Sequence, residues 1–137
     1  MAIAALAVAG ENIVAAATIS EETYTAFKYR LPAQGITVKF VDINNADSVH
    51  TAIDEMTRAI YIESISSVGL EIADISAMAS IAHEAGVPLI VWVHPGRCKL
   101  YRERWKGERA LMSILPGITH LVSQVTSSVP STTELIS

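Results

Sequence analysis

Residues 74–93, DISAMASIAHEAGVPLIVWV, largely decide the fold, because they have the pattern of a helix followed directly by a buried strand. Asp74 begins the helical pattern. Gly86 ends it just before Pro88, since glycine is the usual residue beyond a helix C-terminus. Residues 89–93 are continuously apolar, as expected of a strand covered on both faces. The segment predicts one helix–strand unit of an α/β sheet.

The same alternation of strand and helix patterns continues on both sides of this unit. Short apolar runs predict further strands at residues 12–17, 37–41, 59–63 and 120–125. Helical periodicity predicts helices at residues 21–30 (capped by Ser20 and ended by Pro32 and Gly35), 47–56, from 99 onward, and 110–115. Strand–helix alternation favours right-handed βαβ units. We therefore expect an α/β three-layer sandwich with a mostly parallel sheet of about five strands.

The composition indicates a single domain without metal, disulfide or membrane span. Half of the 137 residues are apolar, and the mean hydropathy is +0.36. The one cysteine, Cys98, excludes an internal disulfide, and the four scattered histidines lack metal-ligand spacing. No apolar run reaches the length of about 20 residues that a membrane span needs. Residues 1–10 lack the basic start of a signal peptide, so we expect a buried first helix and a cytoplasmic protein.

One stretch is strongly basic. Residues 97–109, RCKLYRERWKGER, contain six basic and two acidic residues, a net charge of +4. The whole chain has a net charge of −4, so the remaining residues together have −8. A basic stretch with aromatic residues can bind nucleic acid, but an acidic body repels phosphate backbones. A solvated amphipathic helix explains the same pattern. We expect no nucleic-acid partner.

Several ordered motifs resemble one enzyme family. They are GENIV at residues 10–14, SEETYTAF at 20–27, YIESISSV at 61–68, AHEAGVPLIV at 82–91 and GITHLVSQVTS at 117–127. Their order resembles that of the pyridoxal-phosphate (PLP) enzymes of cysteine and methionine metabolism, the cystathionine γ-synthase, methionine γ-lyase and O-acetylhomoserine sulfhydrylase family. The resemblance implies a truncated and diverged relative, a fragment of the PLP fold-type I large domain without the small C-terminal domain.

At the positions where the family holds PLP, this sequence has other residues. The resemblance places Ser20 where the family has a tyrosine stacked on the ring, and Ser67 where it has an asparagine. Trp92 replaces the aspartate that holds the ring nitrogen, and Ser127 replaces the Schiff-base lysine. A hydroxyl cannot form an imine with an aldehyde, and an indole cannot keep the pyridinium protonated. We therefore expect no cofactor.

The domain organisation follows from the same comparison. We expect one PLP-transferase-like domain over residues 1–128 and a loose Ser/Thr-rich tail over 129–137. Residues 94–109 make the spacing after Trp92 longer than in the family, so we interpret them as an inserted segment. An insertion and a shifted reading frame are both open as the origin of the sequence after Val93.

The candidate site lies where the strands end, because open parallel sheets bind ligands at the carboxyl ends of their strands. We take Glu63 and His94 as candidate acid–base residues, with a turn residue as the alternative for His94. The candidate ligand-binding residues are Ser20, Ser67, Trp92, Tyr101, Trp105 and Ser127. Trp92 is alternatively a core residue. No metal ligands are among them.

Two functional hypotheses remain. An indole in place of a carboxylate makes a site more apolar, which suits a hydrophobic ligand. The first hypothesis is thus a repurposed, cofactor-independent protein that binds a hydrophobic small molecule, for example as a pericyclase-like cyclase or isomerase in a biosynthetic pathway. The alternative is a non-catalytic pseudoenzyme that regulates or assembles with a full-length relative. Under both we expect a homo-oligomer, a dimer or larger, and no membrane partner.

Overall fold

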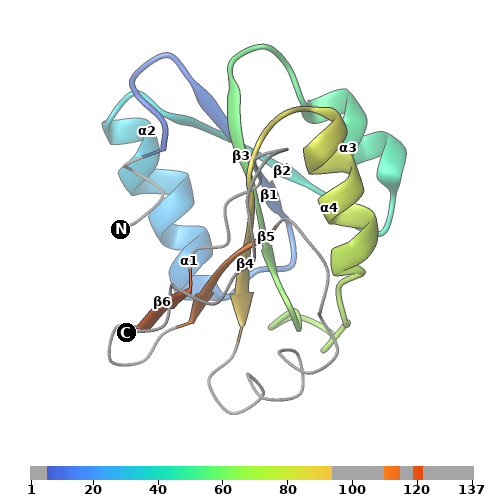
Figure 1. Cartoon of the computed structure of the whole chain (residues 1–137). Coiled ribbons are helices and arrows are strands. Elements are labelled where there is room, and N and C mark those ends of the chain that lie inside the picture. The colour runs from blue at the N-terminus through green and yellow to red at the C-terminus, as the bar shows by residue number, and fades with distance from the viewer. Residues whose placement is uncertain (1–5, 94–109, 115–118, 122–137) are drawn as a thin grey trace.

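The computed structural model describes residues 6–93, 110–114 and 119–121, which form a single layered α/β unit (Figure 1). Their strands form a six-stranded sheet in the order β2-β1-β3-β4-β5-β6. Neighbouring strands from β2 to β5 are parallel, and β6 is antiparallel to β5. The predicted α/β class and the mostly parallel sheet are confirmed.

The inner strands are buried, whereas β2 is only partly covered. β1 is buried along its whole length, and β3 and β4 are buried at all but one position each. The strands are β1 Asn12–Ala16, β2 Thr37–Val41, β3 Thr57–Glu63, β4 Leu89–Val93, β5 Ala110–Ile114 and β6 Thr119–Leu121. The continuous apolar runs thus mark strands covered on both faces, as predicted.

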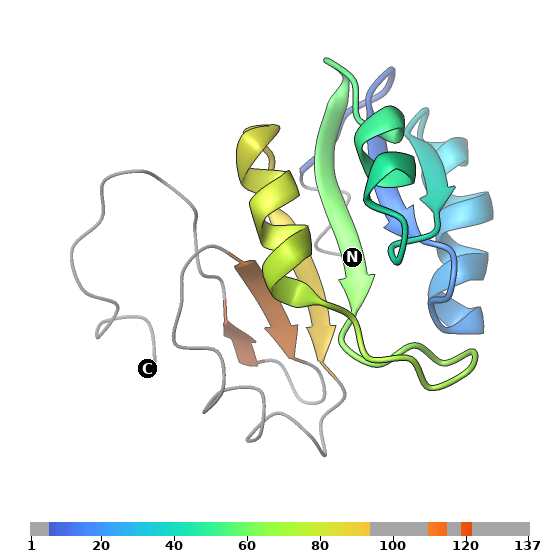
Figure 2. The ribbon, with the colours of Figure 1, turned by 90° about the vertical axis from the view of Figure 1, so that its right-hand side faces the viewer.

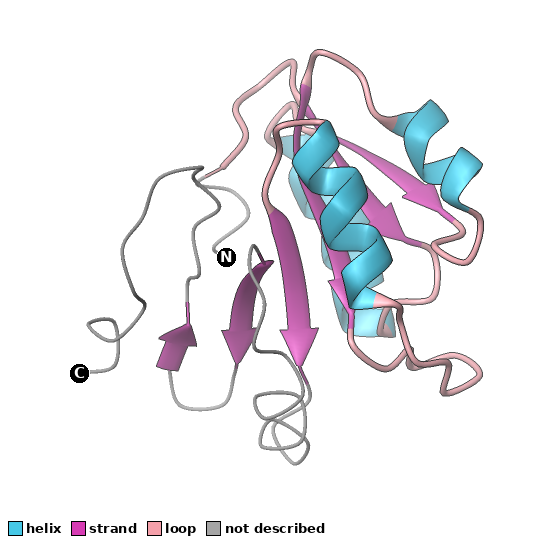
Figure 3. Cartoon of the chain, turned by 45° about the vertical axis from the view of Figure 1, so that its right-hand side comes forward, coloured by secondary structure: helices cyan, strands magenta, loops and turns pink. Residues whose placement is uncertain are grey.

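Helices cover both faces of the sheet and complete three layers (Figures 1 and 2). One layer is a continuous helical run made of α1 Glu21–Thr25, η2 Ala26–Arg30 and α2 Leu31–Ala33. The other contains α3 Ala46–Ala52 and α4 Ile75–Glu84, and Figure 3 shows both helices on the same side of the strands. Phe27 and Leu31 fill the core on the first side, and Val49 and Met78 are buried on the second.

The first helical run passes through Pro32, which the sequence analysis took as a break. η2 is a π-helical turn, in which the Leu31 N–H donates to the carbonyl of Ala26, five residues earlier. In a regular α-helix a proline ring clashes with the carbonyl four residues before it, here that of Lys28. The wider turn lets Pro32 remain helical, and the chain turns at Gly35 instead.

Helix α4 agrees with its prediction at both ends. The Asp74 carboxylate accepts the Ala77 N–H at 3.0 Å, which satisfies one of the free donors of the first turn. Gly86 has φ +69°, the left-handed conformation expected just past a helix end.

Three other predictions were wrong. The helix expected at residues 47–56 ends at Ala52, because Ile53 is extended. Residues 110–114, expected as a short helix, form β5, and this makes the sheet six strands rather than five. Residues 6–10, the described part of the first predicted helix, form turns.

A polar network holds together the edge of the sheet where the strands begin. The Asp54 carboxylate accepts hydrogen bonds from Lys39 at 2.6 Å and from Asn12 at 2.8 Å. It also accepts the Met56 N–H and the Thr57 hydroxyl. The hydrogen bond from Lys39, followed by that from Asn12, holds the pKa of Asp54 well below its usual value.

This lowered pKa makes stability depend on pH. Because the pKa of Asp54 is lower in the folded than in the unfolded chain, the stabilisation is present above about pH 4 and is lost as the pH falls towards the folded pKa. Asp54→Asn should therefore lower the free energy of unfolding at neutral pH, and its difference from the parent should shrink in acid. Urea unfolding across pH measures this. Glu55→Gln is the control, because the Glu55 side chain makes none of these hydrogen bonds. Its free energy of unfolding should show no such pH-dependent difference from that of the parent.

Gly35 provides a second stability test. It has φ +80°, and a Cβ there would lie 2.8 Å from the Cβ of Ala9. Gly35→Ala should lower the free energy of unfolding by roughly 1–3 kcal/mol, since it combines left-handed strain with a steric clash. The matched control is Gly86→Ala. Gly86 also has a left-handed φ of +69°, but an added Cβ there would have no atom within 4 Å, so this variant has the backbone strain without the clash. Equal losses in urea unfolding would show that the contact with Ala9 has no effect.

Candidate functional site

Three candidate residues from separate segments meet around the last residue of β3. The Glu63 side chain is buried, with 5% of its residue surface exposed. Its carboxylate accepts the backbone N–H of Ser20 at 3.1 Å and the hydroxyl of Ser67 at 3.3 Å. Ser20 directly precedes α1, and Ser67 lies in the exposed turn after β3. The carboxyl ends of β1 and β3 are thus joined through one buried carboxylate.

The turn that carries Ser67 is ordered by its neighbour Ser66. The Ser66 hydroxyl donates to the carbonyl of Val68 and accepts the N–H of Glu71. The Ser66 N–H also donates to the carbonyl of Glu71 at 2.8 Å. These bonds close the turn and leave Ser67 at its exposed side, between solvent and Glu63.

Tyr61 and Thr23 extend the cluster, and the sequence analysis missed both. Tyr61 lies two residues before Glu63 and faces the same side of the sheet, with its ring edge-on to Phe27 at 4.9 Å. Burial, and secondly the negative charge of Glu63, raise the pKa of Tyr61 well above its usual value, while a hydrogen bond with Thr23 opposes the shift. Thr23 also accepts the Ser20 hydroxyl at 2.9 Å. Two-residue alternation along the strand is the signal that could have indicated Tyr61.

Trp92 lies beside Glu63. The two residues are paired in the register of β3 and β4, so their side chains stand next to each other on the face covered by α1. Trp92 is half-buried and packs against the core, and its carbonyl accepts the Ser64 N–H at 2.8 Å. The indole therefore forms an apolar side of the cluster. Because it also packs against the core, it agrees in part with the alternative interpretation of Trp92 as a core residue.

The other candidate residues are not among those that the structure describes. His94, Tyr101, Trp105 and Ser127 lie outside the described residues, as do the basic segment at 97–109 and the tail at 129–137. In the described part of the chain, no three His, Cys, Asp or Glu side chains are grouped so that they could hold a metal ion. Over the same residues, no helix is both long enough and apolar enough to cross a membrane.

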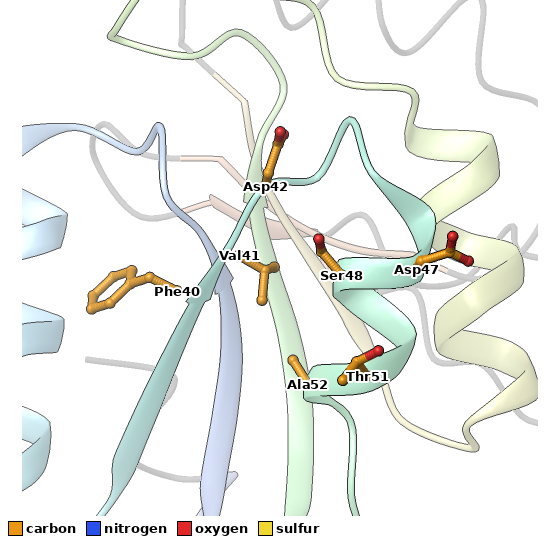
Figure 4. Close-up of a pocket in the computed structure, with 7 residues that line it drawn as sticks. All are labelled: Phe40, Val41, Asp42, Asp47, Ser48, Thr51 and Ala52. Carbon is orange, nitrogen blue, oxygen red and sulfur yellow. The ribbon is translucent and has the colours of Figure 1, made fainter.

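A shallow depression of about 500 Å³ lies away from this cluster, between β2 and α3 (Figure 4). It is lined by Phe40, Val41, Asp42, Asp47, Ser48, Thr51 and Ala52. None of these residues belongs to the Glu63 cluster, and the sequence analysis did not predict a site there.

Comparison with known proteins identifies the family. Residues 1–93 match the family model described as Cys/Met metabolism PLP-dependent enzyme. The chain belongs to this family. The match ends with β4, and the motif at residues 117–127 that we compared with the family lies beyond it.

The relatives are much longer than this chain. It is 44% identical over 91 residues to a homocysteine synthase of Schizosaccharomyces pombe, covering 66% of this chain and 21% of that protein. It is 37% identical over 83 residues to an O-acetyl-L-homoserine sulfhydrylase of Leptospira meyeri, covering 61% and 19%. A solved O-acetylhomoserine sulfhydrylase of Wolinella succinogenes matches with a TM-score of 0.64 and 37% identity, over 66% of this chain and 26% of that one. The chain thus spans about a fifth of its curated relatives.

The described residues do not fit the cofactor that the family name implies. The Ser20 hydroxyl bonds to Thr23 and has no ring face, while the Ser67 hydroxyl is directed to Glu63. Beside Glu63 on β4, Trp92 provides an indole and no carboxylate. Neither described lysine belongs to this cluster, since Lys28 lies over the Tyr24 ring and Lys39 is bound to Asp54. We therefore derive no chemistry through PLP.

Glu63 is expected to be structurally essential to the cluster. Glu63→Ala should lower the free energy of unfolding by about 1–3 kcal/mol, because it leaves the Ser20 N–H and the Ser67 hydroxyl without this acceptor. Glu63→Gln should cost less, since its amide oxygen can still accept one of the two bonds. Urea unfolding at neutral pH measures both. Equal losses for the two variants would contradict a role for the hydrogen bonds.

Proposed function

We propose that this chain is a PLP-independent member of its family that binds a hydrophobic small molecule at the carboxyl edge of the sheet. The observation that carries the proposal is the indole of Trp92 paired in register with the buried carboxylate of Glu63. Ligand sites combine apolar walls with a few placed polar groups. Trp92 supplies such a wall, and Glu63 with Ser67 supplies the polar groups.

The same groups support catalysis without a cofactor, of the cyclase or isomerase type. Glu63 is an acceptor with more lone pairs than its two donors use, so it can also accept a proton or hydrogen bond from a ligand. Holding a flexible substrate in a reactive conformation beside it accelerates an intramolecular step. We assign His94 as a second acid–base group, and Tyr101, Trp105 and Ser127 as further parts of the site.

Three further parts of the proposal rest on the sequence. They are a single domain over residues 1–128, a homo-oligomer, and action in the cytosol. The alternative, a pseudoenzyme that assembles with a full-length relative, is supported by no contact among the described residues, and we do not favour it.

The proposal predicts that the protein does not form an internal aldimine. After mixing with PLP and reduction with borohydride, intact-mass analysis should show only the scattered, substoichiometric adducts of surface lysines, because Ser127 stands where the family lysine is expected. One stoichiometric adduct at a single lysine would overturn PLP independence.

Ligand binding is tested separately. Small molecules that copurify with the protein are identified by mass spectrometry, and binding of the identified compound is measured by calorimetry. Trp92→Asp should abolish binding, because it places a carboxylate where an apolar wall is needed. Ser67→Ala should weaken binding by about 0.5–1.5 kcal/mol, the worth of one hydrogen bond. Thr51→Ala, in the separate depression, is the control. Folded variants that bind as the parent does would contradict the assigned site.

A further inference from the structure

The outer edge of β2 is unpaired among the residues that the structure describes. β2 is the first strand of the sheet and pairs only with β1. Its residues are partly or fully exposed, whereas every residue of β1 is buried. Such an edge presents free backbone groups to other strands, and proteins usually block it with prolines, bulges or charged side chains, lysine above all. The sequence TVKFV has no proline, and its one charge, on Lys39, is already paired with Asp54.

The free backbone groups of this edge can be named from the register. Thr37 donates its N–H to Glu11 of the segment before β1, and the Val41 carbonyl accepts from Ala17. Since successive residues of a strand direct their backbone groups to opposite sides, Lys39 also faces β1. The N–H and C=O groups of Val38 and Phe40 therefore point outward.

These four groups are complementary to the same four groups of a second copy. In an antiparallel pair, residues of a hydrogen-bonded pair exchange both their N–H···O bonds. If Val38 lies opposite the partner's Phe40, then Phe40 lies opposite the partner's Val38, and four hydrogen bonds form around a two-fold axis. If the two strands were shifted by two residues in either direction, one of the hydrogen-bonded pairs would include Ile36 or Asp42. The Ile36 N–H already donates to Leu31, and the Asp42 carbonyl already accepts from Asn45.

We propose that two copies of this chain associate through antiparallel pairing of their β2 strands, with Lys39 at the two-fold axis, to form one continuous sheet. The pairing places Val38 next to the partner's Phe40 on one face, a combination of β-branched and aromatic residues that stabilises neighbouring strands. It also removes the exposed edges of both copies at once. The proposal does not depend on the function assigned to the Glu63 cluster.

A partly exposed aromatic cluster of Tyr24, Tyr29 and Phe40 lies beside this edge and supports the same interface. The Phe40 ring lies 4.7 Å from the ring of Tyr24 on α1. The Lys28 amine lies 5.3 Å from the centre of the Tyr24 ring and 5.8 Å from that of Tyr29, which is 63% exposed. Aromatic residues of this kind are enriched at protein interfaces. They flank β2 on the face that Phe40 occupies.

The opposite face carries charges that the pairing can accommodate. Figure 4 shows Val41 and Phe40 on opposite sides of β2, with Val41 towards α3. Lys39 shares the side of Val41, so the two Lys39 side chains of a dimer would be neighbours. Each amine is bound to its own Asp54 at 2.6 Å and to the carbonyl of Ala52 at 2.9 Å. This pairing reduces the repulsion between them.

Sedimentation velocity of the full chain at tens of micromolar tests the association. The parent should sediment as a dimer. Val38→Pro should weaken the dimer at least about tenfold, because it removes an outward N–H from each copy and leaves the hydrogen bonds with β1 intact. Leu70→Glu, which changes an exposed apolar side chain outside β2 and outside the aromatic cluster, should leave the dimer unchanged. A parent that is monomeric overturns the proposal.

Disulfide trapping tests the register even if Val38→Pro fails to fold. With Cys98→Ser as background, Lys39→Cys should form a disulfide-linked dimer under mild oxidation. The Cα atoms of a non-hydrogen-bonded antiparallel pair lie about 4.5 Å apart, within the range of disulfides. Thr37→Cys should not cross-link with itself, since it lies opposite the partner's Val41. Equal cross-linking of the two variants, or none with Lys39→Cys, overturns the assigned pairing.

Discussion

The parallel pairing of β1, β3 and β4 is the constraint on which the rest of the structure depends. It aligns Ala15, Tyr61 and Ile90 in one row, and it brings the ends of three strands to one edge. Parallel strands joined by crossover helices are covered on both faces, so their side chains must be apolar on both sides. A polar group at the end of such a strand must therefore find its partners in the loops of that edge. Glu63 does so through Ser20 and Ser67.

The sequence predicts this fold because its signals are local and agree with one another. Apolar runs, the cap at Asp74 and the turn at Gly86 each specify one element, and the family motifs confirm their order. The failures occur where local signals compete with packing. Pro32 usually ends a helix, but a π-turn before it lets the helical run continue. Residues 110–114 have no strong strand pattern, yet they pair with β4 along its whole length.

The site is predictable only in part, for the same reason. Strand ends and family motifs indicated Ser20, Glu63 and Ser67, and the structure joins them by hydrogen bonds. Tyr61 was missed because an aromatic residue inside an apolar strand normally belongs to the core. Strand alternation places Tyr61 on the face of Glu63, but its hydrogen bond with Thr23, 38 positions away in the sequence, is visible only in the structure. Such contacts depend on the packing of α1 against β3, which no local pattern specifies.

The register of β3 and β4 bears on the proposal that this family member works without PLP, because it pairs position 92 with Glu63. These positions are neighbours in the register, so an aspartate at 92 would stand beside the buried carboxylate of Glu63. Like charges on directly adjacent strand positions are destabilising, and more so where water is excluded. A bound pyridinium would neutralise such a pair, but a site without the cofactor would not. An indole at position 92 brings no second charge beside Glu63 and packs against the core, so Trp92 is physically consistent with the proposed PLP-independent function.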